Sequence, residues 1–230
     1  MVDVSPAHGL SRAEELVRRI LTSEAISGRP TVLRFAKGQI VYHGGEAGER
    51  CFLIRHGRAS VTLQAGPGDP VMLNILGPSD IFGELALLRQ DHTRSATVQA
   101  LEQLETVTIG RADFDRARHA DPAMNELLLE ALADRIGELS TRLAELASVP
   151  ARQLVHRCLL RMGDTFGVRG VERAVIPLTQ PQLASIAGVG LRMTHKVLAE
   201  ARNQGTITTG TGFVRVDDWD RVCRVAGVAL

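Results

Sequence analysis

The sequence predicts an α+β chain built from three consecutive parts: an antiparallel β-barrel of jelly-roll type, one long helix, and a C-terminal winged helix-turn-helix domain. Short β-type runs alternate with glycine turns between about Pro30 and Ile109, and leucines then recur at heptad spacing. Two short helices joined by a glycine-containing turn, followed by a hairpin, complete the chain. We therefore expect domains at residues 1–120, 121–149 and 150–230.

A short helix is expected at the start of the chain. Ser11 and Glu14 have the spacing of a capping box, in which each side chain bonds the backbone amide of the other residue. The apolar residues that follow recur at helical spacing: Leu16, Val17, Ile20 and Leu21.

The barrel is expected from short runs rich in β-branched and apolar residues, separated by glycines. The predicted strands are Gln39–Tyr42, Cys51–Ile54, Ser60–Leu63, Val71–Leu76, Thr97–Ala100 and Leu104–Ile109. Strands this short and this frequent are typical of a sandwich or a barrel. One short helical piece, from Gly83 to Leu88, interrupts them, and such irregular segments on a rigid scaffold are favoured places for ligands.

A long helix begins at Asp121-Pro122, because proline is favoured at the first helical position. Six apolar residues then alternate at spacings of three and four, which is the pattern of a coiled-coil seam. The seam residues are Leu129, Leu132, Ile136, Leu139, Leu143 and Leu146. These side chains either pack on their own barrel or meet a second copy of the helix, and their regularity favours a homodimer.

The last part reads as a helix from Ala151 to Asp164, then a helix-turn-helix. Thr179 is the expected N-cap of the first helix of the motif, and Gly188 is its expected end. The second helix is expected from Leu191 to Gln204, and the glycine-turned segment from Gly205 to Val216 is expected to form a wing. This combination favours DNA binding.

The net charge of +1 conceals an asymmetry along the chain. Residues 1–149 carry 16 basic and 20 acidic side chains, whereas residues 150–230 carry 11 and 6. A basic C-terminal part suits contact with a polyanion such as DNA, although an excess this small is not diagnostic by itself.

Cysteine usage and hydropathy point to a cytoplasmic protein with no membrane partner. Cys51, Cys158 and Cys223 match neither a disulfide framework nor a zinc spacing, which suits a reducing compartment. No signal-peptide pattern is visible at the start, and no apolar stretch approaches the roughly 20 residues of a membrane helix.

The segment from Gly83 to Ala96, which we call the cassette, carries the clearest chemical motif. Gly83 lets the backbone approach a ligand, and Arg94 can hold a phosphate through two parallel charged hydrogen bonds. Glu84 can accept a hydrogen bond from a sugar hydroxyl. A Glu and an Arg this close are often only a solvated pair. The joint pattern and its barrel context favour a sugar–phosphate site instead.

This segment resembles the phosphate-binding cassette of cyclic-nucleotide-binding domains, which runs Gly-Glu-Leu, several variable residues, then Arg-Ser/Thr-Ala. The order of parts from residue 10 to residue 218 resembles the cyclic-AMP receptor protein and fumarate–nitrate regulator family of bacterial transcription factors. The resemblance implies that Glu84 binds the ribose 2′-hydroxyl, that Arg94 and Ser95 bind the cyclic phosphate, and that backbone at Gly83 and Leu85 lines the same site. It also implies a homodimer that binds double-stranded operator DNA, with RNA polymerase as a further partner.

The long helix departs from the family where cyclic-AMP receptors contact adenine. Those receptors use a Thr-Ser pair, the Thr from one subunit and the Ser from the other. The seam register places Leu139 at the Thr position and Ser140 at the Ser position. A Leu cannot receive the adenine amino group, and Thr141 lies about 100° further around the helix. Ser140 therefore remains a candidate base contact, and weak selectivity for adenine is expected.

The second helix of the helix-turn-helix, which is the recognition helix in this family, also departs from the family pattern. The family carries Ser-Arg-Glu-Thr-Val-x-Arg, in which the two Arg and the Glu read base edges, and here Leu191, Arg192 and Lys196 occupy those three positions. Arg192 and Lys196 can contact guanine O6 and N7, or equally phosphates that position without specifying. The predicted DNA contacts are Thr179, Gln180, Gly190, Arg192, Thr194, His195 and Lys196.

Signatures of other effectors and of catalysis are missing from the sequence. No amino-terminal cysteine cluster suits an iron–sulfur centre, residues 121–149 hold no His or Cys for haem, and no nucleophile–base set is visible. We predict no enzymatic activity, metal or cofactor, and a cyclic nucleotide effector with cyclic AMP favoured. Two alternatives remain: the same regulator with a vestigial pocket or another effector, and a regulatory subunit of a partner enzyme.

Overall fold

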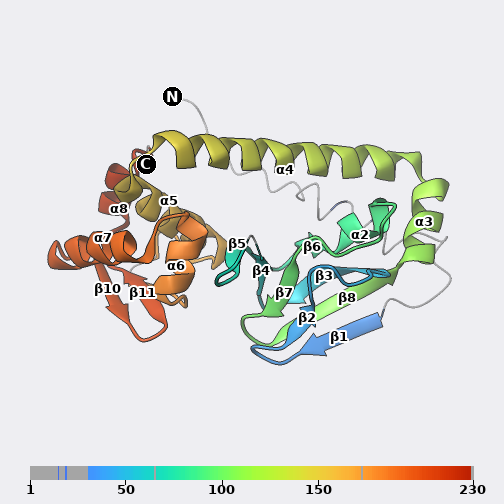
Figure 1. The fold of residues 1–230 in the computed structure, drawn as a ribbon, viewed down its shortest axis with the longest axis horizontal. Helices are drawn as coiled ribbons and strands as arrows, with labels where there is room; N and C mark the ends of the chain where they lie inside the picture. The colour runs from blue at the N-terminus through green and yellow to red at the C-terminus, as the bar shows by residue number, and fades with distance from the viewer. Residues whose placement is uncertain (1–14, 16–18, 20–30, 65, 172, 229–230) are drawn as a thin grey trace. The chain divides into compact units, whose positions relative to one another are not determined.

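We describe the chain from a computed structural model that places residues 15, 19, 31–64, 66–171 and 173–228 (Figure 1). The predicted α+β fold is confirmed, because antiparallel strands are followed by one long helix and a C-terminal helix-turn-helix. The helix predicted after Ser11 lies outside the described residues, except for Glu15 and Arg19.

The strands are β1 (Thr31–Phe35), β2 (Ile40–Tyr42), β3 (Arg50–His56), β4 (Ala59–Leu63), β5 (Val71–Leu76), β6 (Ile81–Phe82), β7 (Thr97–Ala100), β8 (Leu104–Gly110), β9 (Ala174–Ile176), β10 (Ile207–Gly210) and β11 (Phe213–Val216). The helices are α2 (Glu84–Leu88), α3 (Arg111–Ala120), α4 (Pro122–Ser148), α5 (Ala151–Thr165), α6 (Gln180–Ala187), α7 (Leu191–Asn203) and α8 (Trp219–Ala226).

Two four-stranded sheets form the barrel region. The first has the order β1-β8-β3-β6, with antiparallel pairing that sets Val32 opposite Val107 and Cys51 opposite Ile109. The second has the order β2-β7-β4-β5, and its β2–β7 pairing shifts register between Ile40 and Tyr42. The strands predicted for the barrel are all present, and β1 and β6 are additional strands that the sequence pattern did not indicate.

Residue contacts divide the chain into two units, which we describe separately. Unit 1 contains residues 1–59 and 78–138, and unit 2 contains residues 60–77 and 139–230. The predicted domain boundaries fall next to the start of α4 at Pro122 and between α4 and α5, and they remain predictions. Among the described residues, no helix combines the length and the apolar content needed to cross a membrane.

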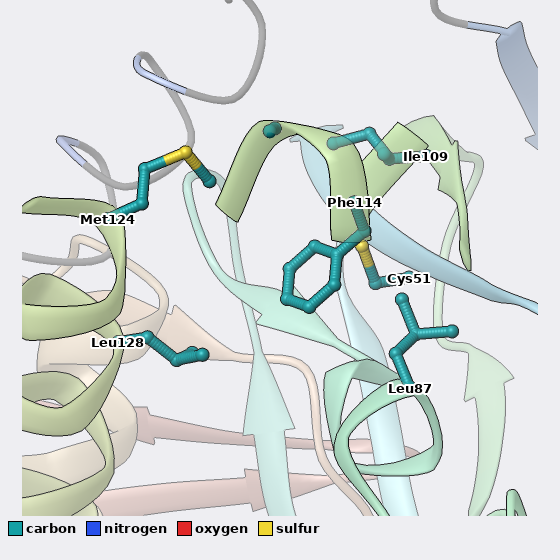
Figure 2. Close-up of a cluster of buried hydrophobic side chains, with 7 residues drawn as sticks. Cys51, Leu87, Ile109, Phe114, Met124 and Leu128 are labelled. Atoms are coloured by element: carbon teal, nitrogen blue, oxygen red, sulfur yellow. The ribbon is translucent and has the colours of Figure 1, made fainter. Parts of the chain in front are cut away.

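A cluster of buried apolar side chains organises unit 1 (Figure 2). Phe114 of α3 and Met124 and Leu128 of α4 pack with Cys51 of β3 and Leu87 of α2. Fully burying a side chain of this size contributes roughly 1.5–3 kcal/mol, so the cluster holds α2 and the start of α4 on the sheet. Burial also raises the pKa of Cys51 to about 12, which keeps its thiol neutral.

Unit 2 holds the helix-turn-helix and its wing. Helix α5 packs against α6, α7 and α8, and the sheet β10-β11-β9 supplies the predicted hairpin. Trp219 of α8 donates its indole N–H to the Val171 carbonyl at 3.0 Å. The side chain of Asp218 caps α8 by accepting from the Arg221 amide at 2.8 Å.

Candidate functional site

Two glycines allow the cassette backbone to close around Arg94. Gly83 adopts φ 82°, a left-handed conformation that disfavours other residues, and a Cβ there would lie 2.5 Å from Arg94 Nη1. A Cβ at Gly48 would lie 2.7 Å from Arg94 Nε and 2.5 Å from the Ala86 Cβ. Both contacts are closer than real Cβ atoms tolerate, so these positions require glycine while Arg94 keeps this conformation.

Arg94 is a buried cation with an incomplete set of partners. Its side chain is in a residue only 7% exposed, and its Nη1 donates to the Gly83 carbonyl at 2.9 Å. The guanidinium carbon lies 4.1 Å from the centroid of the Tyr42 ring, within cation–π range. Among the residues that the structure describes, none supplies a hydrogen-bond partner to its buried Nε. Burial lowers the pKa of Arg94, but a guanidinium stays protonated at neutral pH, so the site presents a desolvated positive charge.

Backbone hydrogen bonds fix the chain on both sides of this charge. The Arg94 amide donates to the Glu46 carbonyl at 2.9 Å, and the Arg94 carbonyl accepts from the Gly45 amide at 2.8 Å. Phe52 and Phe82 stack beneath the site with ring centroids 4.9 Å apart, and both lie within 6.0 Å of the Tyr42 ring centroid. The guanidinium is therefore held by a rigid aromatic and backbone frame.

Glu84 lies beside this charge at the start of α2. Burial raises the pKa of its carboxyl group, and the positive charges of Arg135 and then Arg94 oppose that rise. Arg135 comes from α4 and was absent from the predicted site. It lies one helical turn before Leu139 on the long helix, and this spacing was the only sequence signal that could have indicated it.

The remaining residues predicted to contact the ligand are Leu85, Ser95 and Ser140, and their side chains differ in exposure. Leu85 is partly buried next to Glu84, and Ser95 follows Arg94 with an exposed side chain. Ser140 is exposed on the part of α4 that belongs to unit 2, so its role as a base contact remains a prediction. Within the described residues, no group of three or more His, Cys, Asp or Glu side chains is placed to hold a metal ion.

The predicted seam of α4 is largely uncovered within a single chain. Most of its members are exposed by half or more: Leu129 by 66%, Ile136 by 64%, Leu139 by 53% and Leu143 by 68%. Leu132 instead packs against the buried cluster of unit 1, and Leu146 lies against the turn at Gly188. Met124 and Leu128 are the buried residues of α4, and both belong to that buried cluster (Figure 2).

The helix-turn-helix forms as the sequence predicts. Thr179 and Gln182 make a capping box at the start of α6, since the Thr179 side chain accepts from the Gln182 amide and the Gln182 side chain accepts from the Thr179 amide. Gly188 ends α6 in the left-handed conformation with φ 67°. Gly190 then caps α7.

The predicted DNA contacts divide into exposed and buried residues. Thr179, Arg192, His195 and Lys196 are exposed, and Gln180 is partly exposed. Thr194 is 0% exposed, and its hydroxyl faces the Val189 carbonyl at 3.4 Å inside the domain. Its side chain is part of the packing between α7 and the turn, so we remove Thr194 from the proposed contacts with DNA.

The chain thus contains, in order, antiparallel sheets that carry a buried arginine, a long helix and a winged helix-turn-helix, and family models match the first and last of these parts. The family model described as "Cyclic nucleotide-binding domain" matches residues 32–121, and the one described as "Crp-like helix-turn-helix domain" matches residues 153–225.

Proteins similar along most of their length have related descriptions. The chain is 32% identical over 197 residues to a "CRP-like cAMP-activated global transcriptional regulator" of Mycobacterium tuberculosis, covering 84% of this chain and 86% of the relative. It is 27% identical over 187 residues to a "Cyclic AMP receptor protein" of Thermus thermophilus, covering 79% and 82%. A solved CRP/FNR-family regulator of Thermus thermophilus shares the fold with a TM-score of 0.72 at 21% identity, covering 86% and 98%. The chain therefore belongs to the cyclic-AMP receptor protein and fumarate–nitrate regulator family.

Proposed function

We propose that this protein is a homodimeric transcription regulator that binds a cyclic nucleotide in its barrel and operator DNA through α6 and α7. Cyclic AMP is the favoured effector. The observation that carries the proposal is the buried Arg94 guanidinium, whose Nε has no partner in the described part of the chain. A buried cation with a free donor is stabilised by an anion that supplies the missing acceptor, and a cyclic phosphate carries both the charge and the oxygens.

The cassette residues take distinct roles in this proposal. Arg94 donates to two phosphate oxygens, and the exposed Ser95 hydroxyl adds a further donor. Glu84 accepts from the ribose 2′-hydroxyl, while the backbone at Gly83 and Leu85 lines the site. The positive charge of Arg135 lowers the cost of keeping Glu84 ionised.

The homodimer forms through the exposed seam of α4. Leu129, Ile136, Leu139 and Leu143 present large apolar side chains to solvent in one chain. A stripe of this kind on a helix of 27 residues is stabilised when the same stripe of a second copy covers it. A two-fold dimer places two recognition helices on an operator with two half-sites.

Regulation requires that the nucleotide bind the DNA-competent and DNA-incompetent states with different affinities. A regulatory rather than catalytic role is supported by relatives described as transcription regulators. RNA polymerase is the further partner that such a role entails. The Crp-like domain at residues 153–225 favours DNA over a partner enzyme as the output of the barrel.

Leu139 supports a second candidate: a DNA-binding regulator of the same fold whose effector is not cyclic AMP. Leu has no group that hydrogen-bonds the adenine amino group. Isothermal titration of the purified protein with cyclic AMP, cyclic GMP and cyclic CMP separates the candidates. Binding of cyclic AMP that is lost in Arg94→Met supports the leading proposal. Binding of cyclic GMP or cyclic CMP without cyclic AMP, or binding of none of the three, would favour a different effector or an empty pocket.

A further inference from the structure

Two large apolar side chains are exposed at the beginning of the recognition helix. Leu191 is 42% exposed and Met193 is 45% exposed, although α7 already buries one face. That buried face consists of Thr194, Val197, Leu198 and Ala201, which recur at helical spacing. Leu191 and Met193 lie at the two edges of that buried face, and nearly half of each side chain is exposed to solvent.

Two basic residues lie between these side chains on the surface of the helix. Arg192 stands between them in sequence, so Leu191 and Met193 each lie about 100° around the helix from it, on opposite sides. Lys196 is exposed one turn further along, on the same side as Arg192. The first turn of α7 carries no acidic residue. The helix thus offers a positive centre with an apolar flank on either side, which complements a polyanion that also displays apolar groups.

Double-stranded DNA displays one apolar group in its major groove, the C5-methyl of thymine. We propose that Leu191 and Met193 read thymine methyl groups on the two sides of the base pair or phosphate that Arg192 contacts. This inference rests on the proposed binding of operator DNA by α7 and adds which bases it selects. Leu191 and Met193 would then recognise bases through apolar contact and not through hydrogen bonds.

The size of the effect follows from the area of one methyl group. Removing a methyl from a well-packed apolar contact changes affinity about fourfold. Uracil differs from thymine only by this methyl and pairs in the same way, so a thymine-to-uracil replacement measures the contact without disturbing any hydrogen bond.

The test begins with the full-length protein and an operator selected from random duplex DNA, with and without cyclic AMP. Each thymine of the selected operator is then replaced by uracil in both half-sites, and affinities are measured at one fixed salt concentration. We expect two replacements in each half-site, one for Leu191 and one for Met193, to weaken binding about fourfold each. Each replacement should have no effect on Leu191→Ala or Met193→Ala, whichever residue contacts that methyl.

Val228→Ala is the matched control, because Val228 is 39% exposed in the same unit but lies outside α7. It should keep the wild-type response to uracil. Circular dichroism and cooperative thermal unfolding of each variant establish that the domain is folded. Specific binding without the two uracil effects, or an effect that survives both substitutions, would overturn the inference and leave the proposed function intact. Failure to select any operator would overturn both.

Discussion

Replacing Arg94 by Met should leave the stability of the protein nearly unchanged and greatly weaken its affinity for nucleotide. Without ligand, the substitution removes the bond from Nη1 to the Gly83 carbonyl and the contact with the Tyr42 ring. These interactions are worth about 1.5–3 and 0.5–2 kcal/mol. It also removes a buried charge whose Nε finds no partner among the described residues, and the penalty for such a charge is several kcal/mol. Because these terms oppose each other, we expect the substitution either to lower the free energy of unfolding by roughly 1 kcal/mol at most or to raise it.

The effect on nucleotide affinity should be large. A cyclic phosphate loses two charge-assisted hydrogen bonds in Arg94→Met, which together are worth roughly 3 kcal/mol or more, or over a hundredfold in Kd. Calorimetric unfolding provides a second readout. Cyclic AMP at 100 times its wild-type Kd should stabilise the wild type by about 2.7 kcal/mol and the variant by about 0.4 kcal/mol or less.

Arg89→Met is the matched control within the same segment. Arg89 is exposed and pairs with Asp91 at 2.7 Å, so its loss should change neither stability nor nucleotide affinity appreciably. Wild-type affinity for cyclic AMP in Arg94→Met would refute the anion-binding role. A loss of more than about 4 kcal/mol of stability without ligand would show instead that Arg94 is held for structural reasons.

Three further predictions concern Glu84 and the long helix. Burial raises the pKa of Glu84, so its ionised form destabilises the folded protein, and stability should fall as pH rises from its ordinary pKa through the raised one. Glu84→Gln should abolish this pH dependence, raise the melting temperature at neutral pH, and weaken nucleotide binding less than Arg94→Met; an equal loss would make Glu84 structural. Leu143→Glu should convert a micromolar dimer into a monomer by sedimentation, and a monomeric wild type would contradict the seam. The preference for cyclic AMP over cyclic GMP should be about tenfold or less, near 1.4 kcal/mol, and should sharpen in Leu139→Thr and flatten in Ser140→Ala; a thousandfold wild-type preference would show that the register is wrong.

Local signals in the sequence were sufficient for much of the fold. Glycine-bounded β runs, the Thr179 cap and Gly188 each act through neighbouring residues, and each corresponds to an observed element. Helix α3 was missed because only Phe114 and Ala117 of its ten residues are buried, which leaves almost no apolar periodicity.

Helix α8 was also not predicted, although its sequence carries a clear helical pattern. Its N-cap Asp218 and the buried residues Trp219, Val222, Cys223 and Ala226 follow the helical pattern closely, so the signal was present in the sequence. The burial of Thr194 and the position of Arg135 near Glu84 could not be predicted from local sequence patterns. The burial of Thr194 depends on how α7 packs on its turn, and the proximity of Arg135 to Glu84 depends on where α4 meets the barrel. Both are consequences of tertiary packing.

The central claim is that a nucleotide held by Arg94 controls binding to operator DNA. The most direct measurement is the affinity of the purified full-length protein for its selected operator, with and without saturating cyclic AMP, in the wild type and in Arg94→Met. We predict that cyclic AMP changes the wild-type affinity at least fivefold, as expected for a coupling free energy of 1 kcal/mol or more, and has no effect on the variant. The same operator affinity in the wild type with and without nucleotide, or an equal response in Arg94→Met, would contradict the claim.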